Sequence, residues 1–147
     1  MSSSVKKSNE IPISKHLGYL IKITQQEIRK RMDAGLKKLS LTTPQYAVLS
    51  QLEDSPGLSN AGLARRSFIT PQTMNQIVFI LEKEGLIART NHSTNQRIQQ
   101  TNLTSEGKAL LKKAHKIVFQ IEDTLFQDLS EEEKVSLAEL LEKIRVE

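Results

Sequence analysis

Hydrophobic residues recur at helical spacing along most of this chain, with short polar interruptions. Residues 14–40 carry an apolar residue every three or four positions, which predicts a long amphipathic helix. Residues 104–146 carry two more such stretches, and between them Ser130 and Glu133 have the spacing of a capping box, which marks a new helix start. The apolar positions include Leu17, Leu20, Ile21, Ile28, Met32, Leu36 and Leu39 in the first helix and Leu111, Ala114, Val118, Leu125, Leu137, Leu140, Leu141 and Ile144 in the last two.

The middle of the chain contains two helix starts a short distance apart. Ser59 is a suitable N-cap, and Thr70 is another, followed by Pro71 at the first helical position. Only residues 67–69 remain to turn the chain between the two helices. This arrangement predicts a helix-turn-helix, whose second helix usually enters the DNA major groove. A further helix is predicted to begin with Thr43 as its N-cap, because Pro44 follows Thr43 as Pro71 follows Thr70.

A β-hairpin is predicted directly after the helix-turn-helix. Gly85 is a suitable C-cap for the second helix, residues 86–90 and 97–101 can form strands, and the polar residues between them favour a turn. The predicted fold is therefore mainly α with a small β-hairpin wing (α+β), a winged helix-turn-helix with N- and C-terminal dimerisation helices. We expect a flexible tail or arm over 1–12 and one domain over 13–147, in which 41–102 form the winged helix-turn-helix and 14–40 and 104–146 form the dimerisation helices.

The terminal helices carry more apolar surface than one helix face can hold. They can bury it only against one another or against a second copy of the chain, and paired DNA half-sites require two winged helices related by symmetry. We therefore predict a two-fold homodimer. The residues expected in its interface are Ile11, Ile13, Leu17, Leu137, Leu140, Leu141 and Ile144.

Composition limits the remaining possibilities. The chain of 147 residues has no cysteine and no apolar run of membrane-spanning length, which favours a cytoplasmic protein without disulfides or membrane association. The net charge of +4 and the pI near 9.4 permit a nucleic-acid partner. However, residues 41–102 contain nearly balanced basic and acidic side chains. No histidine has a second ligand at helical metal-site spacing, and no catalytic motif is present, so we expect no metal, no cofactor and no enzyme activity.

Several segments, in this order and at these spacings, resemble the multiple-antibiotic-resistance regulator (MarR) family of winged helix-turn-helix proteins. They are 41–49, 58–66, 70–74, 81–89, Arg97 and 103–107. The resemblance covers the chain after the tail. It implies a dimer that binds a roughly palindromic DNA operator, usually as a repressor, and often releases DNA on binding a small aromatic or phenolic ligand.

The chain departs from the family pattern at three places. Asn95 stands where an acid usually precedes the wing arginine, Gln76 stands where an arginine is frequent, and Phe79-Ile80 replace a common Asp–Arg pair. We expect Phe79 and Ile80 to pack against the wing or a neighbouring helix rather than to contact bases.

The outward side chains near the start of the second helix are polar and uncharged. We predict base contacts from Gln72, Thr73, Asn75 and Gln76, because Gln and Asn can pair with adenine and Thr can contact a thymine methyl group. The alternative is that some of these residues are only solvated. Contacts to the DNA backbone and from the wing are predicted for Ser59, Asn60, Arg65, Arg66, Thr70, Arg89, His92 and Arg97, with Arg97 in the minor groove.

The resemblance also implies a ligand pocket between the first long helix, the helix beginning at Thr43 and the recognition unit. His16, Tyr19, Lys22 and Tyr46 are the polar candidates there, although structural roles are open to each of them. The sequence thus predicts a sequence-specific DNA-binding regulator, a homodimeric repressor under the control of a small effector. The alternative is a dimeric winged-helix scaffold that acts through protein contacts or nonspecific DNA binding.

Overall fold

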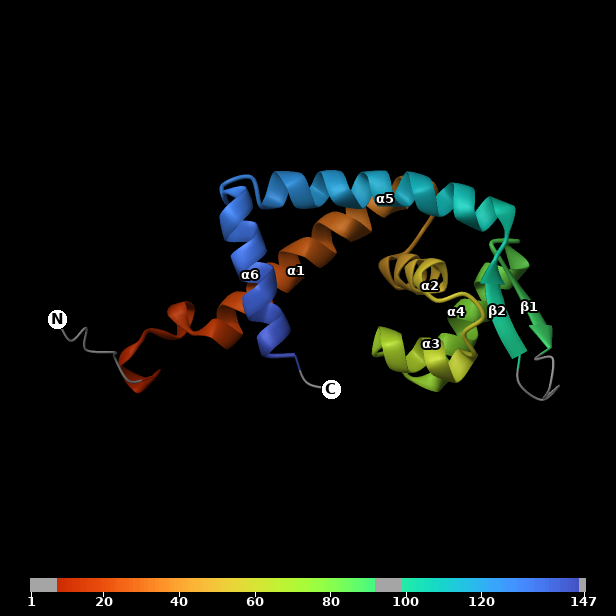
Figure 1. Cartoon of the computed structure of the whole chain (residues 1–147), viewed down its shortest axis with the longest axis horizontal. Helices are drawn as coiled ribbons and strands as arrows, with labels where there is room; N and C mark the ends of the chain where they lie inside the picture. The colour runs from red at the N-terminus through yellow and green to blue at the C-terminus, as the bar shows by residue number, and fades with distance from the viewer. Residues whose placement is uncertain (1–7, 92–98, 146–147) are drawn as a thin grey trace. The chain divides into compact units, whose positions relative to one another are not determined.

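The computed structural model describes residues 8–91 and 99–145, which are mainly helical with one antiparallel hairpin (Figure 1). This arrangement confirms the predicted fold class. In chain order the elements are η1 (Ser8–Glu10), η2 (Ile13–Lys15), α1 (Leu17–Leu36), η3 (Lys37–Leu39), α2 (Thr43–Asp54), α3 (Asn60–Ser67), α4 (Pro71–Lys83), β1 (Ile87–Asn91), β2 (Gln99–Leu103), α5 (Ser105–Leu125) and α6 (Glu131–Lys143).

The chain forms two compact units. Asp33–Gln120 contain α2, α3, α4, the hairpin and most of α5, and we call them the central unit. Met1–Met32 and Ile121–Glu147 form the second, which we call the terminal unit. Within the described ranges, no helix combines the length and the apolar character that crossing a membrane requires.

Side-chain caps fix the predicted helix starts. The Ser59 hydroxyl accepts a hydrogen bond from the backbone N–H of Gly62 at 3.1 Å, and Thr70 accepts one from Thr73 at 3.3 Å. Ser130 and Glu133 exchange both hydrogen bonds of a capping box, at 3.1 and 2.9 Å. These three starts lie where the sequence predicts them, because each depends only on residues three positions apart.

The start of α2 differs from the prediction by one residue. Its N-cap is Thr42, not Thr43, because Gln45 lies three residues after Thr42 and reaches back to its backbone N–H at 3.0 Å. Thr42 in turn accepts from the Gln45 backbone N–H at 3.2 Å. The capping box therefore decides the helix start, and Pro44 is still accommodated in the first turn, where no helical N–H is required.

The core of the central unit lies among α2, α3, α4, β1 and α5. Each of these elements contributes side chains with almost no exposed surface, which removes their apolar surface from water and stabilises the unit. Leu36, the last residue of α1, adds a further buried side chain. The largest fully buried apolar side chains are Leu36, Val48, Leu49, Leu52, Leu63, Met74, Val78, Leu81, Ile87 and Leu111.

The hairpin begins later than predicted because the Leu86 backbone N–H closes the turn that follows α4. Gly85 adopts a left-handed backbone with φ of 76°, and the Leu86 N–H donates to the Leu81 carbonyl at 3.0 Å. Pairing therefore runs from Ile87 opposite Leu103 to Asn91 opposite Gln99. The C-cap of α4 is Glu84, so the predicted cap at Gly85 is wrong by one residue: Gly85 is the left-handed residue directly after the cap. The first strand accordingly begins one residue later than predicted.

Two further contacts hold the hairpin against the helices. Thr101 donates to the Leu58 carbonyl at 3.0 Å and accepts from the Gly57 N–H at 3.0 Å, which joins β2 to the segment before α3. At the start of α5, a Cβ atom on Gly107 would lie 2.0 Å from the Leu86 carbonyl oxygen. Glycine is therefore required there, and the first turn of α5 packs closely against the turn between α4 and β1.

The terminal unit differs from the central unit in its burial. None of its described residues is buried, although α1 and α6 carry many leucines and isoleucines. A single chain therefore leaves a large apolar surface on these helices in contact with water, and such surfaces mark contacts with other molecules.

Candidate nucleic-acid interface

One face of α4 is exposed and polar at its first two turns. Gln72, Thr73, Asn75 and Gln76 are all exposed, whereas Met74, Val78 and Leu81 on the opposite side of the helix are fully buried. The outward direction predicted for the four polar residues is therefore present in the structure. Their contacts with bases stay a prediction.

Two of these four polar residues already have hydrogen-bond partners in the central unit. Asn60, the first residue of α3, donates from its side-chain amide to the Asn75 side-chain oxygen at 3.0 Å. Pairing with adenine requires both an acceptor and a donor on the same amide. In this arrangement one of the two lone pairs of the Asn75 oxygen is already used, while its amide N–H groups remain available to donate. Thr73 accepts a hydrogen bond from the Thr70 hydroxyl at 3.0 Å, which positions the first turn of α4.

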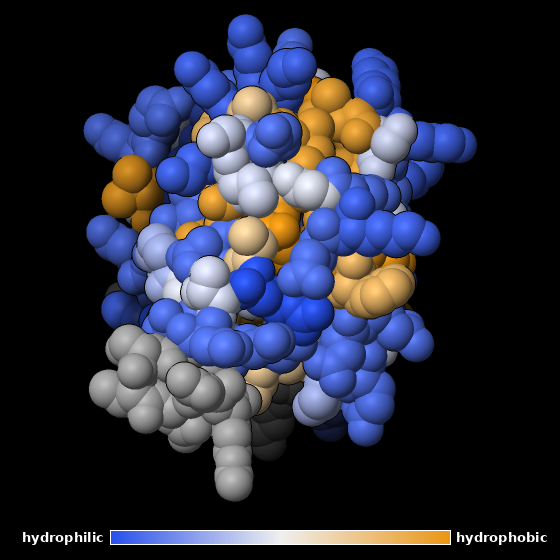
Figure 2. Space-filling view, turned by 90° about the vertical axis from the view of Figure 1, so that its right-hand side faces the viewer, coloured by the Kyte–Doolittle hydropathy of each residue, from blue (hydrophilic) through white to orange (hydrophobic). Residues whose placement is uncertain are grey.

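Three large apolar side chains of this helix pair are exposed. Phe79 is 61% exposed, Ile80 is 42% exposed and Phe68, in the turn between α3 and α4, is 95% exposed. The expectation that Phe79 and Ile80 pack against the wing or a neighbouring helix is therefore wrong. Phe79 follows Gln72 by seven residues, which is about two helical turns, so both side chains lie on the outward face of α4. Figure 2 shows the side of the molecule where the hairpin lies, with hydrophobic atoms gathered between largely hydrophilic side chains.

Acidic residues neutralise two of the arginines near the helix-turn-helix. Arg89 on β1 donates to both carboxylate oxygens of Glu82 on α4, at 2.7 and 3.1 Å. This hydrogen bonding lowers the pKa of Glu82 and raises the pKa of Arg89. Arg66 donates to the Ser55 hydroxyl at 2.6 Å and lies 3.7 Å from the Asp54 carboxylate.

These pairs reduce the positive charge available to phosphates. Arg65 is exposed at the end of α3. Ser59 and Thr70 use their hydroxyl oxygens to cap α3 and α4. His92, Asn95 and Arg97 lie outside the described residues, so the contacts predicted for the wing stay predictions.

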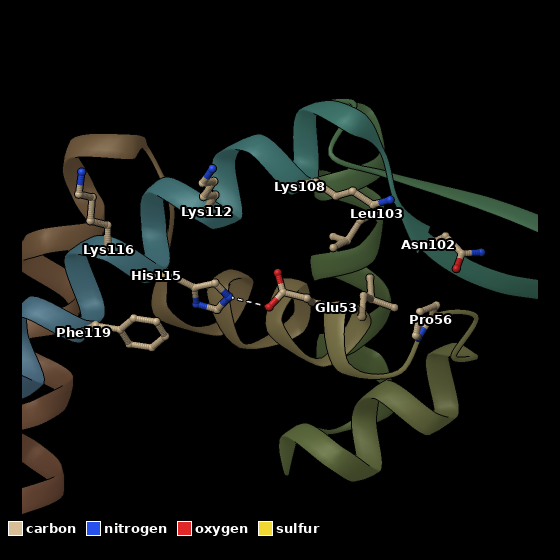
Figure 3. A pocket seen from close by; sticks show the side chains of 10 residues that line it. Glu53, Pro56, Asn102, Leu103, Lys108, Lys112, His115, Lys116 and Phe119 are labelled. Carbon is tan, nitrogen blue, oxygen red and sulfur yellow. Dashed lines mark hydrogen bonds and ion pairs between the residues drawn. The ribbon is translucent and has the colours of Figure 1, made fainter.

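A cavity of about 810 Å³ opens on another part of the central unit, between α2, β2 and α5 (Figure 3). His115 on α5 lies between two side chains of α2. Its Nδ1 atom is 2.7 Å from the Tyr46 hydroxyl, and its Nε2 atom is 2.9 Å from the Glu53 carboxylate. The Phe119 ring stacks on the His115 ring, with 5.2 Å between their centroids. The lining residues are Leu52, Glu53, Pro56, Asn102, Leu103, Lys108, Lys112, His115, Lys116 and Phe119.

The lining of this cavity combines apolar and aromatic surface with charged groups of both signs, the Glu53 carboxylate and three lysines. Ligand sites are mostly apolar with a few placed polar groups, and here an aromatic ring, leucines and a histidine face the same space. Lys108, Lys112 and Lys116 follow one another at one-turn spacing along α5 and add positive charge at its border. In Figure 3 Lys112 and Lys116 extend from α5 in a different direction from His115 and Phe119.

The ligand pocket predicted from the sequence does not coincide with this cavity. Only Tyr46 belongs to the central unit, whereas His16, Tyr19 and Lys22 belong to the terminal unit. The pocket that would combine them stays a prediction. Sequence reasoning considered His115 only as a metal ligand and missed the cavity. The available signal was the repetition of Lys108, Lys112 and Lys116 beside His115 and Phe119 on one helix. In the described part of the chain, no three His, Asp or Glu side chains gather as a metal site would require.

Comparison with known proteins places these features in a family. Residues 41–99 match the model of the MarR family. The HTH-type transcriptional repressor Rv2887 of Mycobacterium tuberculosis is 35% identical over 128 residues, which cover 87% of this chain and 92% of that protein. The chain belongs to the MarR family. A second relative, the HTH-type transcriptional regulator SarZ of Staphylococcus epidermidis, is 30% identical over 132 residues, 88% of this chain and 86% of that protein.

Solved structures agree with this family assignment. The crystal structure of the M. tuberculosis MarR family protein Rv2887 in complex with DNA has a TM-score of 0.75 at 33% identity, covering 89% of this chain and 98% of that chain. The structure of the same protein in complex with salicylic acid has a TM-score of 0.75 at 33% identity, covering 92% and 100%. The Bordetella bronchiseptica protein BpsR shares the fold, with a TM-score of 0.81 at 24% identity over 91% of this chain and 96% of that chain.

Proposed function

We propose that this chain is a cytoplasmic, sequence-specific DNA-binding repressor that acts as a homodimer on a roughly palindromic operator. The observation that carries the proposal is the exposed polar face of α4, held on a helix-turn-helix by the caps at Ser59 and Thr70. A relative that is one-third identical binds DNA in its crystal structure, which supports the same use of this helix.

Gln72 and Gln76 are the best candidates for reading bases. Each side-chain amide is exposed and can pair with adenine through N6 and N7 in the major groove. Thr73 can contact a base or a thymine methyl group, and the Asn75 amide can donate to a base while Asn60 donates to its oxygen. We expect Ser59, Asn60, Arg65, Arg66, Thr70, Arg89, His92 and Arg97 to lie along the backbone and the minor groove.

The proposed dimer explains the exposed apolar surface of the terminal unit. Leu17 is 78% exposed, Leu140 57% and Ile144 63% in the single chain. A second copy related by two-fold symmetry can cover these side chains and at the same time present two recognition helices to two half-sites. The proposed interface comprises Ile11, Ile13, Leu17, Leu137, Leu140, Leu141 and Ile144.

We propose that a small aromatic acid or phenol controls DNA binding and that it occupies the cavity beside His115. The salicylic acid complex of the relative supports this class of effector. The ligand can control binding only if its affinities for the DNA-binding conformation and for the conformation that does not bind DNA differ. A hundredfold change in operator affinity requires a coupling free energy of about 2.7 kcal/mol between ligand binding and DNA binding.

A competition gel shift tests the proposed function. The full-length protein is titrated onto the DNA upstream of its own gene, with random duplex of the same length as competitor. We expect strong preference for the upstream DNA and a slope of log affinity against log salt of roughly −5 to −7 if the dimer neutralises about six to eight phosphates.

Two variants separate the roles of the residues. Arg97→Ala should weaken binding to every duplex, whereas Gln72→Ala should change sequence preference. Equal loss from both variants on operator and random DNA would contradict this division. Absence of any preference in the wild-type protein would instead favour a scaffold that acts through protein contacts, for which the exposed Phe68, Phe79 and Ile80 supply apolar surface.

A further inference from the structure

Phe79 occupies an unexpected position on the recognition helix. It is 61% exposed and its neighbour Ile80 is 42% exposed, whereas Met74, Val78 and Leu81 on the opposite face of α4 have no exposed surface. An exposed aromatic ring does not contribute buried apolar surface to the stability of the fold, so its position points to a contact with another molecule. The ring lies on the same helical stripe as Gln72 and Gln76, which precede it by seven and three residues.

The spacing along this stripe matches the spacing of bases. Three helical residues rise about 4.5 Å, and successive base pairs are about 3.4 Å apart. Gln76 and Phe79 can therefore reach the same or adjacent base pairs when α4 lies in the major groove. There the only apolar group on a base edge is the 5-methyl group of thymine, which lies beside adenine in every A·T pair.

We propose that Phe79 is a specificity-determining residue that contacts thymine 5-methyl groups in the major groove, next to adenines paired with Gln76. The inference rests on the proposed DNA-binding function. DNA is favoured as the occupant because Phe79 continues a row of uncharged amide side chains on the outward face of a helix whose opposite face is buried. Phe79 therefore adds selectivity for A·T pairs on a helix that has no arginine at its exposed tip.

Removal of single methyl groups tests the inference directly. Duplexes that bind the full-length protein are first selected from a random-sequence pool, and each thymine of a half-site is then replaced by uracil, which lacks only the 5-methyl group. Burial of one methyl group corresponds to about a fourfold change in affinity. We expect wild-type binding to weaken about fourfold at one thymine position per half-site, and about fifteenfold when both half-sites are changed.

The variants Phe79→Ala and Phe79→Leu complete the comparison. Phe79→Ala should weaken binding to the thymine duplex and show no further loss on the uracil duplex. Phe79→Leu keeps an apolar side chain and should retain part of the sensitivity to uracil. Thermal unfolding of both variants shows whether they fold. Loss of the uracil response in Phe79→Ala assigns the methyl contact to Phe79, whereas a full response in that variant would assign it to another residue such as Thr73 and overturn the inference.

The possible failures are distinguishable. If the random pool yields no preferred sequence, the proposed function is overturned and this inference with it. If a preferred sequence emerges but uracil at every position leaves wild-type affinity unchanged, only the role of Phe79 is overturned. Losses from uracil and from Phe79→Ala that simply multiply would also overturn it, since they would show that the ring and the methyl group act separately.

Discussion

At the scale of single residues, Phe68 shows strain. Its φ of 54° lies in the left-handed region, where a Cβ atom is disfavoured by about 1–2 kcal/mol. Its backbone N–H donates to the Arg65 carbonyl at 3.4 Å, so the residue ends α3 as a C-cap where glycine is usual. Since the ring is 95% exposed, packing does not compensate for the strain.

Replacement of Phe68 by glycine should therefore stabilise the protein. We expect Phe68→Gly to raise the free energy of unfolding by about 0.5–1 kcal/mol. The substitution removes the backbone strain, but glycine loses more conformational entropy on folding, and the expected gain is the difference between these two effects. Urea unfolding of the variant and the wild type measures this difference in the free energy of unfolding. The matched control is Phe79→Gly, which should destabilise because it places glycine inside a helix. A lower free energy for Phe68→Gly than for wild type would show that the ring has a stabilising contact.

At the scale of elements, the ion pair between Glu82 and Arg89 joins α4 to β1. The Arg89 hydrogen bond holds the pKa of the Glu82 carboxyl below its ordinary value of 4.5. A lowered folded-state pKa adds stability above the ordinary value, and this stability is lost as the pH falls through the lowered pKa. Both side chains are partly exposed, so the contribution is below about 1 kcal/mol.

Glu82→Gln should reveal this contribution through its pH dependence. At pH 7 we expect a small loss in the free energy of unfolding, and the difference from wild type should shrink as the pH falls below 4.5. Urea unfolding at neutral and acidic pH measures both values. Glu84→Gln, an exposed neighbour on the same helix end, serves as the control. A difference that stays constant at acidic pH would assign the effect to side-chain shape rather than to charge.

At the scale of the whole molecule, the contrast between the two units points to assembly. The central unit contains a packed core, whereas the described residues of the terminal unit include none that is buried. On α6 and at its C-cap, the residues Leu137, Leu140, Leu141 and Ile144 follow helical spacing and are all more than 40% exposed. The terminal unit therefore depends on a partner for a core of its own.

Leu140→Lys should disrupt the proposed dimer. A lysine at this position costs little in a free chain, but it would place an uncompensated charge in the apolar interface of the dimer. Light scattering at micromolar concentration should show a fall from two chains to one, with loss of operator binding. Glu139→Lys, which adds positive charge to an exposed position beside the stripe, should remain dimeric. A dimeric Leu140→Lys protein that binds operator normally would contradict the predicted interface.

The sequence by itself determined the local features of this protein. The caps at Ser59, Thr70 and Ser130 are as predicted and the C-cap of α4 lies within one residue of the prediction, because each depends on residues within one turn of the chain. The order of the helices and the hairpin follows from these signals and from hydrophobic periodicity. The outward direction of Gln72 and Gln76 follows from the same periodicity, since the buried stripe of α4 fixes the opposite face.

Only the tertiary structure decided which side chains meet through space. Glu82 neutralises Arg89 across the junction of α4 and β1, and Tyr46 and His115 meet although 69 residues separate them. The exposure of Phe79 likewise depends on which neighbours reach α4, and periodicity alone does not specify them. Long-range contacts of this kind depend on the packing of whole elements, so the charge at the DNA-binding face and the cavity beside His115 became visible only in the folded chain.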